Sequence, residues 1–308
     1  LSVASLTMFT SGPGQTYTFS VFVDPIINDT GLSRSMVSGL YTAGSLTAAT
    51  GMVLVGRLLD RYGARVMTTI VGVLFGFAAL WMSQVSNPAE LYAGFAAMRL
   101  LGQGSLTLIP TTVVAVWFIR LRGRVMAINS LGSAAIFAAF PPLIHLMISI
   151  VGWRGAWVYL AFIIWGILLL PAILLLRRSP ESVGLRPDGD SVTDQTTEMA
   201  GLARPTLEIN LTLGEALRTR AFWLLLFAGS SQALISTALV FHHVSLITGK
   251  GLDAGLAATV FSVLAPMSLV GNFIAGYLAD RYPNRYLLAI AQVILAAAML
   301  WTFVIFQP

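Results

Sequence analysis

The feature that most constrains the fold of this chain is a charged motif that occurs twice between long apolar segments. The first copy, residues 56–65, reads GRLLDRYGAR, and the second, residues 276–285, reads GYLADRYPNR. Two copies of one loop indicate that a bundle of helices was duplicated, as in membrane proteins that are built from internal repeats. The motif therefore predicts two related halves.

The composition requires a lipid environment. Of the 308 residues, 56% are hydrophobic and 10% are charged, and the mean hydropathy is +0.81. A soluble domain does not bury that much apolar surface. Apolar runs of about 20 residues, the length that crosses a bilayer as a helix, recur along the whole chain. We expect nine spanning helices, at 2–26, 35–56, 66–84, 90–118, 125–150, 154–176, 221–247, 254–278 and 286–306.

The basic residues predict the orientation in the membrane. If the first helix runs outward, the inner loops collect fourteen of the 18 Lys and Arg residues, whereas the outer loops keep only Arg34, Arg154 and Lys250. The positive-inside rule favours this arrangement, which puts both motifs on the cytoplasmic side of the inner membrane. The net charge of +5 thus reflects topology and not a nucleic-acid partner.

A long polar stretch divides the chain. We expect a six-helix bundle over residues 1–176, a cytoplasmic linker over 177–220 and three helices of a second bundle over 221–308. If the halves match, about nine of twelve helices are present and the second bundle is truncated. A protein that has nine helices by nature is the alternative.

The motif resembles the signature loop between the second and third helices of the major facilitator superfamily. Gly56, Asp60, Arg61 and Arg65 carry the first copy, and the second copy is similar, with Pro283 where the first has Gly63. The resemblance implies an all-α membrane fold of two pseudo-repeated bundles around a central cavity. We expect the two glycines to permit close helix approach and the charges to form a conformational latch. The residues expected to control gating are Gly56, Asp60, Arg61, Arg65, Gly276, Asp280 and Arg281. The alternative is that the charges only anchor the loops at the interface.

A narrower resemblance covers most of the first half. The order Trp117-Phe118, Arg122-Gly123-Arg124, Pro141-Pro142 and Gly152-Trp153-Arg154-Gly155 is similar to the monocarboxylate transporters and the related oxalate/formate antiporters. In that group an arginine typically lies four residues before the glycine of the second motif, and some members have an aspartate one turn earlier. Here Asn272 and Ser268 occupy these positions, so the usual anion-binding charge is absent.

Arg99 is the one basic residue well inside an apolar run. Since an unpaired guanidinium is costly in a bilayer, it is a candidate for binding substrate, with snorkelling to the surface as the alternative. Other polar groups within the predicted helices are candidates for substrate contacts or for interhelical hydrogen bonds. The full set of predicted substrate-binding residues is Gln15, Tyr17, Arg99, Gln103, Asn129, Gln232, His242 and Asn272.

His242 and the adjacent His243 lie late in the seventh predicted helix, and only one of them can face the cavity. A histidine there is a candidate for proton coupling, although an interfacial position is the simpler account. We expect no metal site, because adjacent helical residues diverge by about 100 degrees. The chain has no cysteine, which excludes disulfides and thiolate chemistry within these residues.

These observations predict a secondary transporter for a small organic anion, working by proton symport or anion exchange. No nucleotide-binding loop is present in the sequence, so no cofactor is expected and the gradient of an ion or solute would drive transport. The expected partners are the substrate, a proton or counter-anion, and lipid, and the expected state is a monomer. The alternatives are export of an amphiphilic or neutral solute and a non-transporting sensor on the same scaffold. An enzyme is not expected.

Overall fold

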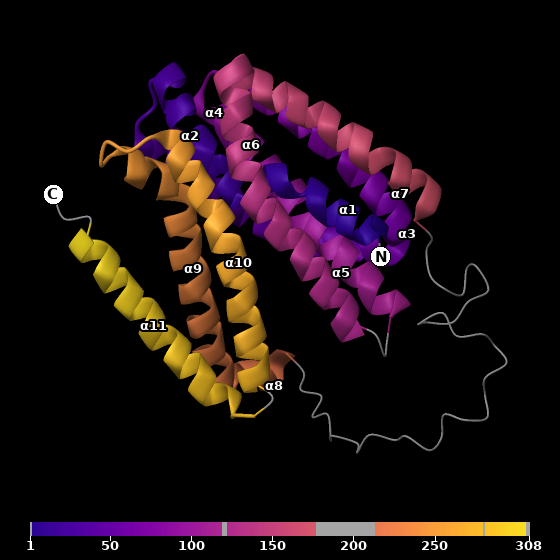
Figure 1. Cartoon of the computed structure of the whole chain (residues 1–308). Coiled ribbons are helices and arrows are strands. Elements are labelled where there is room, and N and C mark those ends of the chain that lie inside the picture. The colour runs from indigo at the N-terminus through magenta and orange to yellow at the C-terminus, as the bar shows by residue number, and fades with distance from the viewer. Residues whose placement is uncertain (1, 119–121, 177–212, 280, 306–308) are drawn as a thin grey trace. The chain divides into compact units, whose positions relative to one another are not determined.

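The computed structural model describes residues 2–118, 122–176, 213–279 and 281–305, and every regular element within them is helical (Figure 1). This confirms the predicted all-α fold. The described α-helices are α1 (Ser2–Thr10), α2 (Thr16–Thr30), α3 (Arg34–Ser83), α4 (Pro88–Met98), α5 (Leu106–Trp117), α6 (Arg122–Ile164), α7 (Leu170–Leu175), α8 (Leu213–Leu217), α9 (Arg220–Thr248), α10 (Ala254–Ala279) and α11 (Asn284–Ile305). A 3-10 turn, η1 (Gly12–Gly14), and two π-helical turns, η2 (Arg99–Ser105) and η3 (Trp165–Leu169), join some of them.

Two of the long helices are each two helices joined at a glycine. In α3 the backbone of Gly63 has φ 80° and ψ 166°, and in α6 that of Gly152 has φ 71° and ψ 167°. A residue with a Cβ rarely adopts such angles, which explains glycine at both turns. The predicted pair 35–56 and 66–84 lies on either side of Gly63, and the pair 125–150 and 154–176 lies on either side of Gly152.

By length and composition alone, five helices within the described residues are suited to crossing a membrane: Arg34–Ser83, Ser133–Leu174, Arg220–Thr248, Ala254–Gly271 and Arg285–Thr302. Two of them contain the glycine breaks. The predicted runs 2–26 and 90–118 are absent from this set because η1 and η2 divide them into shorter helices. Helix therefore occurs in all nine predicted runs of the described chain.

Glycines bring the helices of the first half into close contact. A Cβ on Gly14 would lie 2.7 Å from Cα of Gly102, and a Cβ on Gly76 would lie 2.0 Å from Nε1 of Trp165. Such contacts are possible only without a side chain. At Gly56 no described atom lies within 4 Å of the position of a Cβ, so the close approach expected there stays a prediction.

The contacts group the chain into two compact units. One comprises residues 1–194 together with 241–266, and the other comprises 195–240 together with 267–308. The end of α9 and the first half of α10 thus pack with the first unit, a grouping that does not follow the predicted boundary between bundles. The predicted division into bundles of 1–176 and 221–308 stays a prediction, and most of the predicted linker, residues 177–212, lies outside the described residues.

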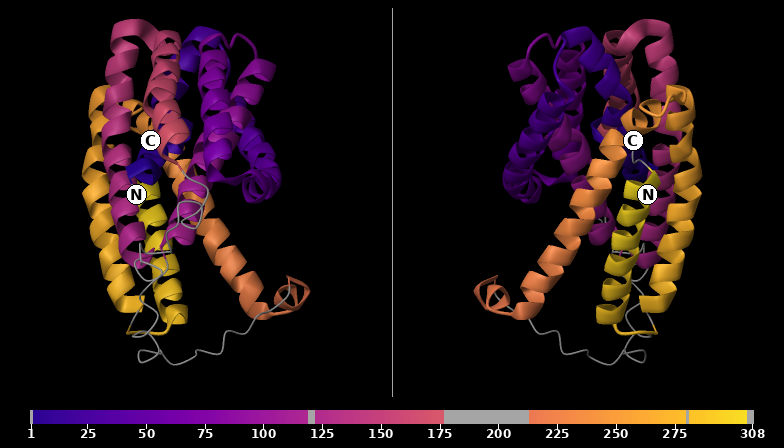
Figure 2. Two further views of the ribbon diagram at one scale, coloured as in Figure 1. Left: turned by 90° about the vertical axis from the view of Figure 1, so that its right-hand side faces the viewer. Right: turned by 90° about the vertical axis from the view of Figure 1, so that its left-hand side faces the viewer.

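In the second unit, α9 and α11 are joined by a side-chain amide. Gln292 of α11 donates to the carbonyl of Ala228 over 3.1 Å and accepts from Ser231 over 3.3 Å. Figure 2 shows α8 turned across the start of α9, where Nε1 of Trp223 donates to the carbonyl of Leu217 over 2.8 Å. These bonds fix the beginning of α9 within its own unit.

Candidate functional site

Arg99 lies inside the first unit and has only neutral partners among the described residues. Its Nε donates to Oγ of Ser45 over 3.1 Å, and its Nη1 donates to Oγ1 of Thr16 over 3.2 Å. Its Cζ lies 5.2 Å from the centre of the Tyr41 ring. A guanidinium carries five N–H donors, so these two bonds leave three donors and a full positive charge for another ligand.

The local backbone at Arg99 is a π-helical turn. The backbone N–H of Leu106 donates to the carbonyl of Leu101, five residues earlier, which is the spacing of a π-helix, and the side-chain hydroxyl of Ser105 donates to the carbonyl of Leu100 over 2.8 Å. Gly102 and Gly104 within the turn admit close neighbours, with a Cβ on Gly104 lying 2.4 Å from Sδ of Met52. Turns of this kind are rare and are frequently found at functional sites.

Tyr41 forms one wall of this site. Its hydroxyl donates to Oγ1 of Thr16 over 3.0 Å, and its ring is stacked on Phe241 with the centroids 4.3 Å apart. Edge contacts to Phe19 and Phe95 complete the packing, and only 4% of Tyr41 is exposed. Aromatic pairs in these geometries add stability beyond the area that they bury, so the ring is held rigidly beside the guanidinium.

The structure brings only some of the predicted substrate residues near Arg99. Gln103 lies on the same π-helical turn, and its Oε1 is buried without a hydrogen-bond partner among the described residues. Gln15 donates to Ser11 over 3.1 Å, and Tyr17 packs edge-on against Phe137, with the ring centroids 5.1 Å apart. The other three polar candidates from the predicted helices cannot be placed at this site: Gln232 is exposed on α9 within the second unit, and the side chains of Asn129 and Asn272 lie outside the described residues.

Thr16 and Ser45, the hydrogen-bond partners of Arg99, were not predicted from the sequence. Small hydroxyl residues are frequent in apolar helices, where most of them bond to the carbonyl four residues earlier. Ser45 makes such a bond, to Tyr41, over 2.8 Å. Only the three-dimensional contact with Arg99 distinguishes these two hydroxyls from the others.

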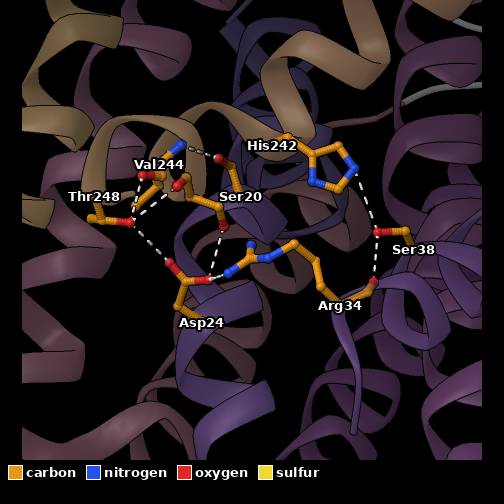
Figure 3. Close-up of polar contacts among 8 residues, drawn as sticks. Ser20, Asp24, Arg34, Ser38, His242, Val244 and Thr248 are labelled. Atoms are coloured by element: carbon orange, nitrogen blue, oxygen red, sulfur yellow. Dashed lines mark hydrogen bonds and ion pairs between the residues drawn. The ribbon is translucent and has the colours of Figure 1, made fainter. Parts of the chain in front are cut away.

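A second charged cluster surrounds Asp24 of α2 (Figure 3). Its carboxylate accepts from Nη2 of Arg34 over 2.7 Å, from the hydroxyl of Ser245 over 2.8 Å and from that of Thr248 over 3.4 Å. The backbone N–H of Val244 donates to Oγ of Ser20 over 3.3 Å. The last turns of α9 are therefore attached to α2 by polar contacts, all of them within the first unit.

The two adjacent histidines point to different neighbours, as expected for consecutive helical residues. Nε2 of His242 lies 3.4 Å from Oγ of Ser38, beside the Asp24 cluster (Figure 3). Nε2 of His243 lies 3.1 Å from the carbonyl of Ala257, and its ring contacts Phe261. Among the described residues, no three His, Cys, Asp or Glu side chains form a group that could hold a metal ion.

The charged side chains of the repeated motif are exposed where the structure describes them. Asp60, Arg61 and Arg65 have exposed side chains, and no ion pair or hydrogen bond from the described residues reaches Asp60. In the second copy, Arg281 lies over the ring of Tyr277 and donates to its hydroxyl. Gly276 lies on α10, and Asp280 is outside the described residues. The charge contact expected of Asp60 therefore has no partner among the residues that the structure describes, and the latch stays a prediction.

The chain matches a known protein family and is similar to several of its members. The sequence model described as Major Facilitator Superfamily matches residues 4–308. The chain is 27% identical to the MFS transporter asaE of Aspergillus flavus, over 80% of the chain and 51% of that protein. It is 25% identical to the oxalate:formate antiporter of Oxalobacter formigenes, over 81% of the chain and 56% of that protein. It thus spans about half the length of these relatives.

Solved structures also match the fold. A bacterial homologue of the human lysosomal transporter Spinster, described as inward-facing and occupied, superposes with a TM-score of 0.65 at 18% identity. The match covers 92% of this chain and 62% of that one. At this identity the similarity supports the fold alone.

Proposed function

Because the chain belongs to the Major Facilitator Superfamily, we propose that its protein is a secondary transporter of a small organic anion and that Arg99 binds the substrate carboxylate. The observation that supports this most directly is the pairing of Arg99 with two neutral hydroxyls and an aromatic ring, without a carboxylate among its described partners. Such a guanidinium attracts an anion, and its planar N–H groups match a carboxylate.

The proposal accounts for the arginine that is missing at position 272, in the eighth predicted helix (254–278). Where the monocarboxylate and oxalate/formate group typically has that arginine, this chain has Asn272. Arg99 would supply the positive charge from the fourth predicted helix. The oxalate:formate antiporter is a relative whose name states an organic-anion substrate, which supports the same class. We expect Gln103, which lies on the same turn and has a buried Oε1 without a described partner, to contact the remainder of a small substrate.

Transport would proceed by alternating access with a proton or a counter-anion as the coupled species. The distribution of arginines supports an inner-membrane location with both motif loops on the cytoplasmic side. A neutral or amphiphilic solute is the second candidate, favoured by Asn272 and by the aromatic wall of Phe19, Tyr41, Phe95 and Phe241.

Uptake into proteoliposomes tests the proposal. The full-length protein is reconstituted, and labelled lactate, pyruvate and oxalate are supplied with and without an inward proton gradient and with and without internal anion. We expect uptake of at least one anion, abolished in Arg99→Ala and retained in the exposed control Arg220→Ala. Absence of flux for all three anions from folded protein would contradict the proposed class and direct the search to neutral and amphiphilic solutes.

A further inference from the structure

Asp24 makes one ion pair and accepts from two hydroxyls. The partner in the ion pair is near Asp24 in the sequence, whereas the two hydroxyls come from a distant helix. Asp24 and Arg34 are ten residues apart, on α2 and on the first residue of α3. Ser245 and Thr248 come from the end of α9, far along the sequence. If α9 moved away from α2, the ion pair would stay with α2 and α3, and only neutral hydroxyls would leave.

The free energy needed to move α9 away from α2 therefore depends on the hydroxyl contacts and not on the ion pair. Separating Asp24 from Arg34 would break a charge-assisted hydrogen bond between side chains that are 25% and 46% exposed, and such bonds are stronger than those between neutral groups. Exchanging a hydroxyl for water at a carboxylate that keeps its arginine costs less, because a protein–water bond replaces the protein–protein bond. The hydroxyl contacts of α9 with Asp24 can therefore form and break while the Asp24–Arg34 ion pair stays in place.

The two hydroxyls are not equivalent. Ser245 donates to Asp24 at 2.8 Å, whereas Thr248 lies at 3.4 Å and also lies 3.0 Å from the carbonyl of Val244 on its own helix. A hydroxyl has one proton to donate, and Thr248 divides it among three acceptors, because the carbonyl of Ser245 also lies 3.3 Å from it. Ser245 is therefore the main contact.

The same end of α9 carries Phe241, one turn before Ser245. Phe241 is 3% exposed and is stacked on Tyr41, the residue whose ring lies beside Arg99. When Ser245 holds α9 against α2, Phe241 is also held against the wall of the Arg99 site. The same contact between α9 and α2 therefore holds Ser245 at Asp24 and Phe241 at the wall of the Arg99 site.

We propose that Ser245 and Asp24 form a gate of the transport path, and that this gate opens by releasing the hydroxyl of Ser245 while the Asp24–Arg34 ion pair stays intact. The proposal rests on the transport function proposed above. The gate lies at the end of α2 and α9 that is distant from the 56–65 motif, because α3 starts beside Asp24 at Arg34 and reaches that motif after its full first helix.

The accessibility of Ser20 tests this gate. Ser20 is fully buried and contacts the N–H of Val244, and the 308 residues contain no cysteine that would compete with an introduced one. The full-length protein with Ser20→Cys as its one cysteine is reconstituted. Its labelling rate by a membrane-impermeant maleimide, added to either side of the membrane, reports how often the gate is open.

In this background we expect Ser245→Ala to raise the labelling rate about tenfold from one side, equivalent to about 1.4 kcal/mol. Thr248→Val should raise it less than about threefold, since that hydroxyl has two other acceptors. Ser245→Thr, which retains a hydroxyl, should restore the slow rate. Thr237→Val, on α9 outside the cluster, should leave the rate unchanged.

Equal rates for Ser245→Ala and the unmodified background, or an equal increase from Thr237→Val, would overturn the proposal. So would fast labelling of Ser245→Thr. The labelling assay needs no substrate, so its result is separate from that of the uptake assay. If no organic anion is transported but Ser245→Ala still labels faster, the proposed substrate class fails and the gate stands.

Discussion

Arg99 and Tyr41 donate hydrogen bonds to the same acceptor, Oγ1 of Thr16, over 3.2 and 3.0 Å. The three residues come from η2, α3 and α2, and the close contact between Gly14 and Gly102 brings the start of α2 next to η2. One threonine hydroxyl therefore orients both the guanidinium and the ring beside it. A positive charge that is held in a fixed direction loses less entropy when an anion binds.

This arrangement predicts different effects for two conservative substitutions. Thr16→Val removes the acceptor that both neighbours use and should raise the KM for the transported anion about tenfold, the equivalent of one hydrogen bond. Tyr41→Phe keeps the ring against Phe241 and Arg99 and should change KM less than about threefold. Initial uptake rates over a range of substrate concentrations give both values. A larger effect from Tyr41→Phe would indicate that its hydroxyl contacts the substrate directly.

Gly76 predicts a sharp steric effect on stability. A Cβ there would lie 2.0 Å from Nε1 of Trp165, which donates to the carbonyl of Val73 over 3.2 Å. Gly76→Ala must displace the indole and break this bond, and we expect a loss of about 2 kcal/mol in the free energy of unfolding, with a lower melting temperature in detergent.

Gly39, which lies on the part of α3 before the break at Gly63, provides the control. No described atom lies within 4 Å of its Cβ position. Gly39→Ala should therefore cause no loss of stability, and the higher helix propensity of alanine favours the opposite sign. Equal melting temperatures for the two variants would show that Trp165 can move aside without cost.

The repeat, the apolar run lengths and the loop motif were enough to predict the helices, because the bilayer sets the length of each element and requires helix in each. They were not enough to predict the breaks at η1 and η2, where backbone bonds such as that of Leu106 to Leu101 and that of Gln15 to Gly12 replace the regular pattern. The hydropathy of an apolar run is the same with or without such a turn, so hydropathy does not reveal the turn.

The candidate site was predictable only in part. Arg99 could be identified because a charge within an apolar run requires an explanation, whereas Thr16 and Ser45 look like ordinary helical hydroxyls. Any glycine in a helix permits a close approach, but only a neighbouring helix makes one. Gly76 has such a neighbour in Trp165, whereas no described atom lies within 4 Å of the Cβ position of Gly56.

The ion pair of Asp29 with Arg154 should contribute little to the free energy of unfolding. Their side chains are 44% and 40% exposed, and exposed pairs typically contribute under about 1 kcal/mol. Arg154 also donates to the carbonyl of Val85 over 2.8 Å and lies 4.2 Å from the centre of the Trp153 ring. Arg154→Ala should therefore lower the melting temperature more than Asp29→Asn, and only the effect of Asp29→Asn should disappear at high salt.

Asp60 gives a prediction about turnover. Its side chain is exposed and has no ion pair with the described residues, so in this conformation Asp60→Asn removes no interaction. If the motif forms its charge contact in another state of the cycle, the substitution should slow turnover about tenfold while substrate affinity and melting temperature stay the same. Asp29→Asn serves as the control for loss of an exposed carboxylate. Steady-state uptake combined with equilibrium binding separates the two quantities, and an equal loss of binding and turnover would mean that Asp60 acts on the substrate site and not on the conformational change.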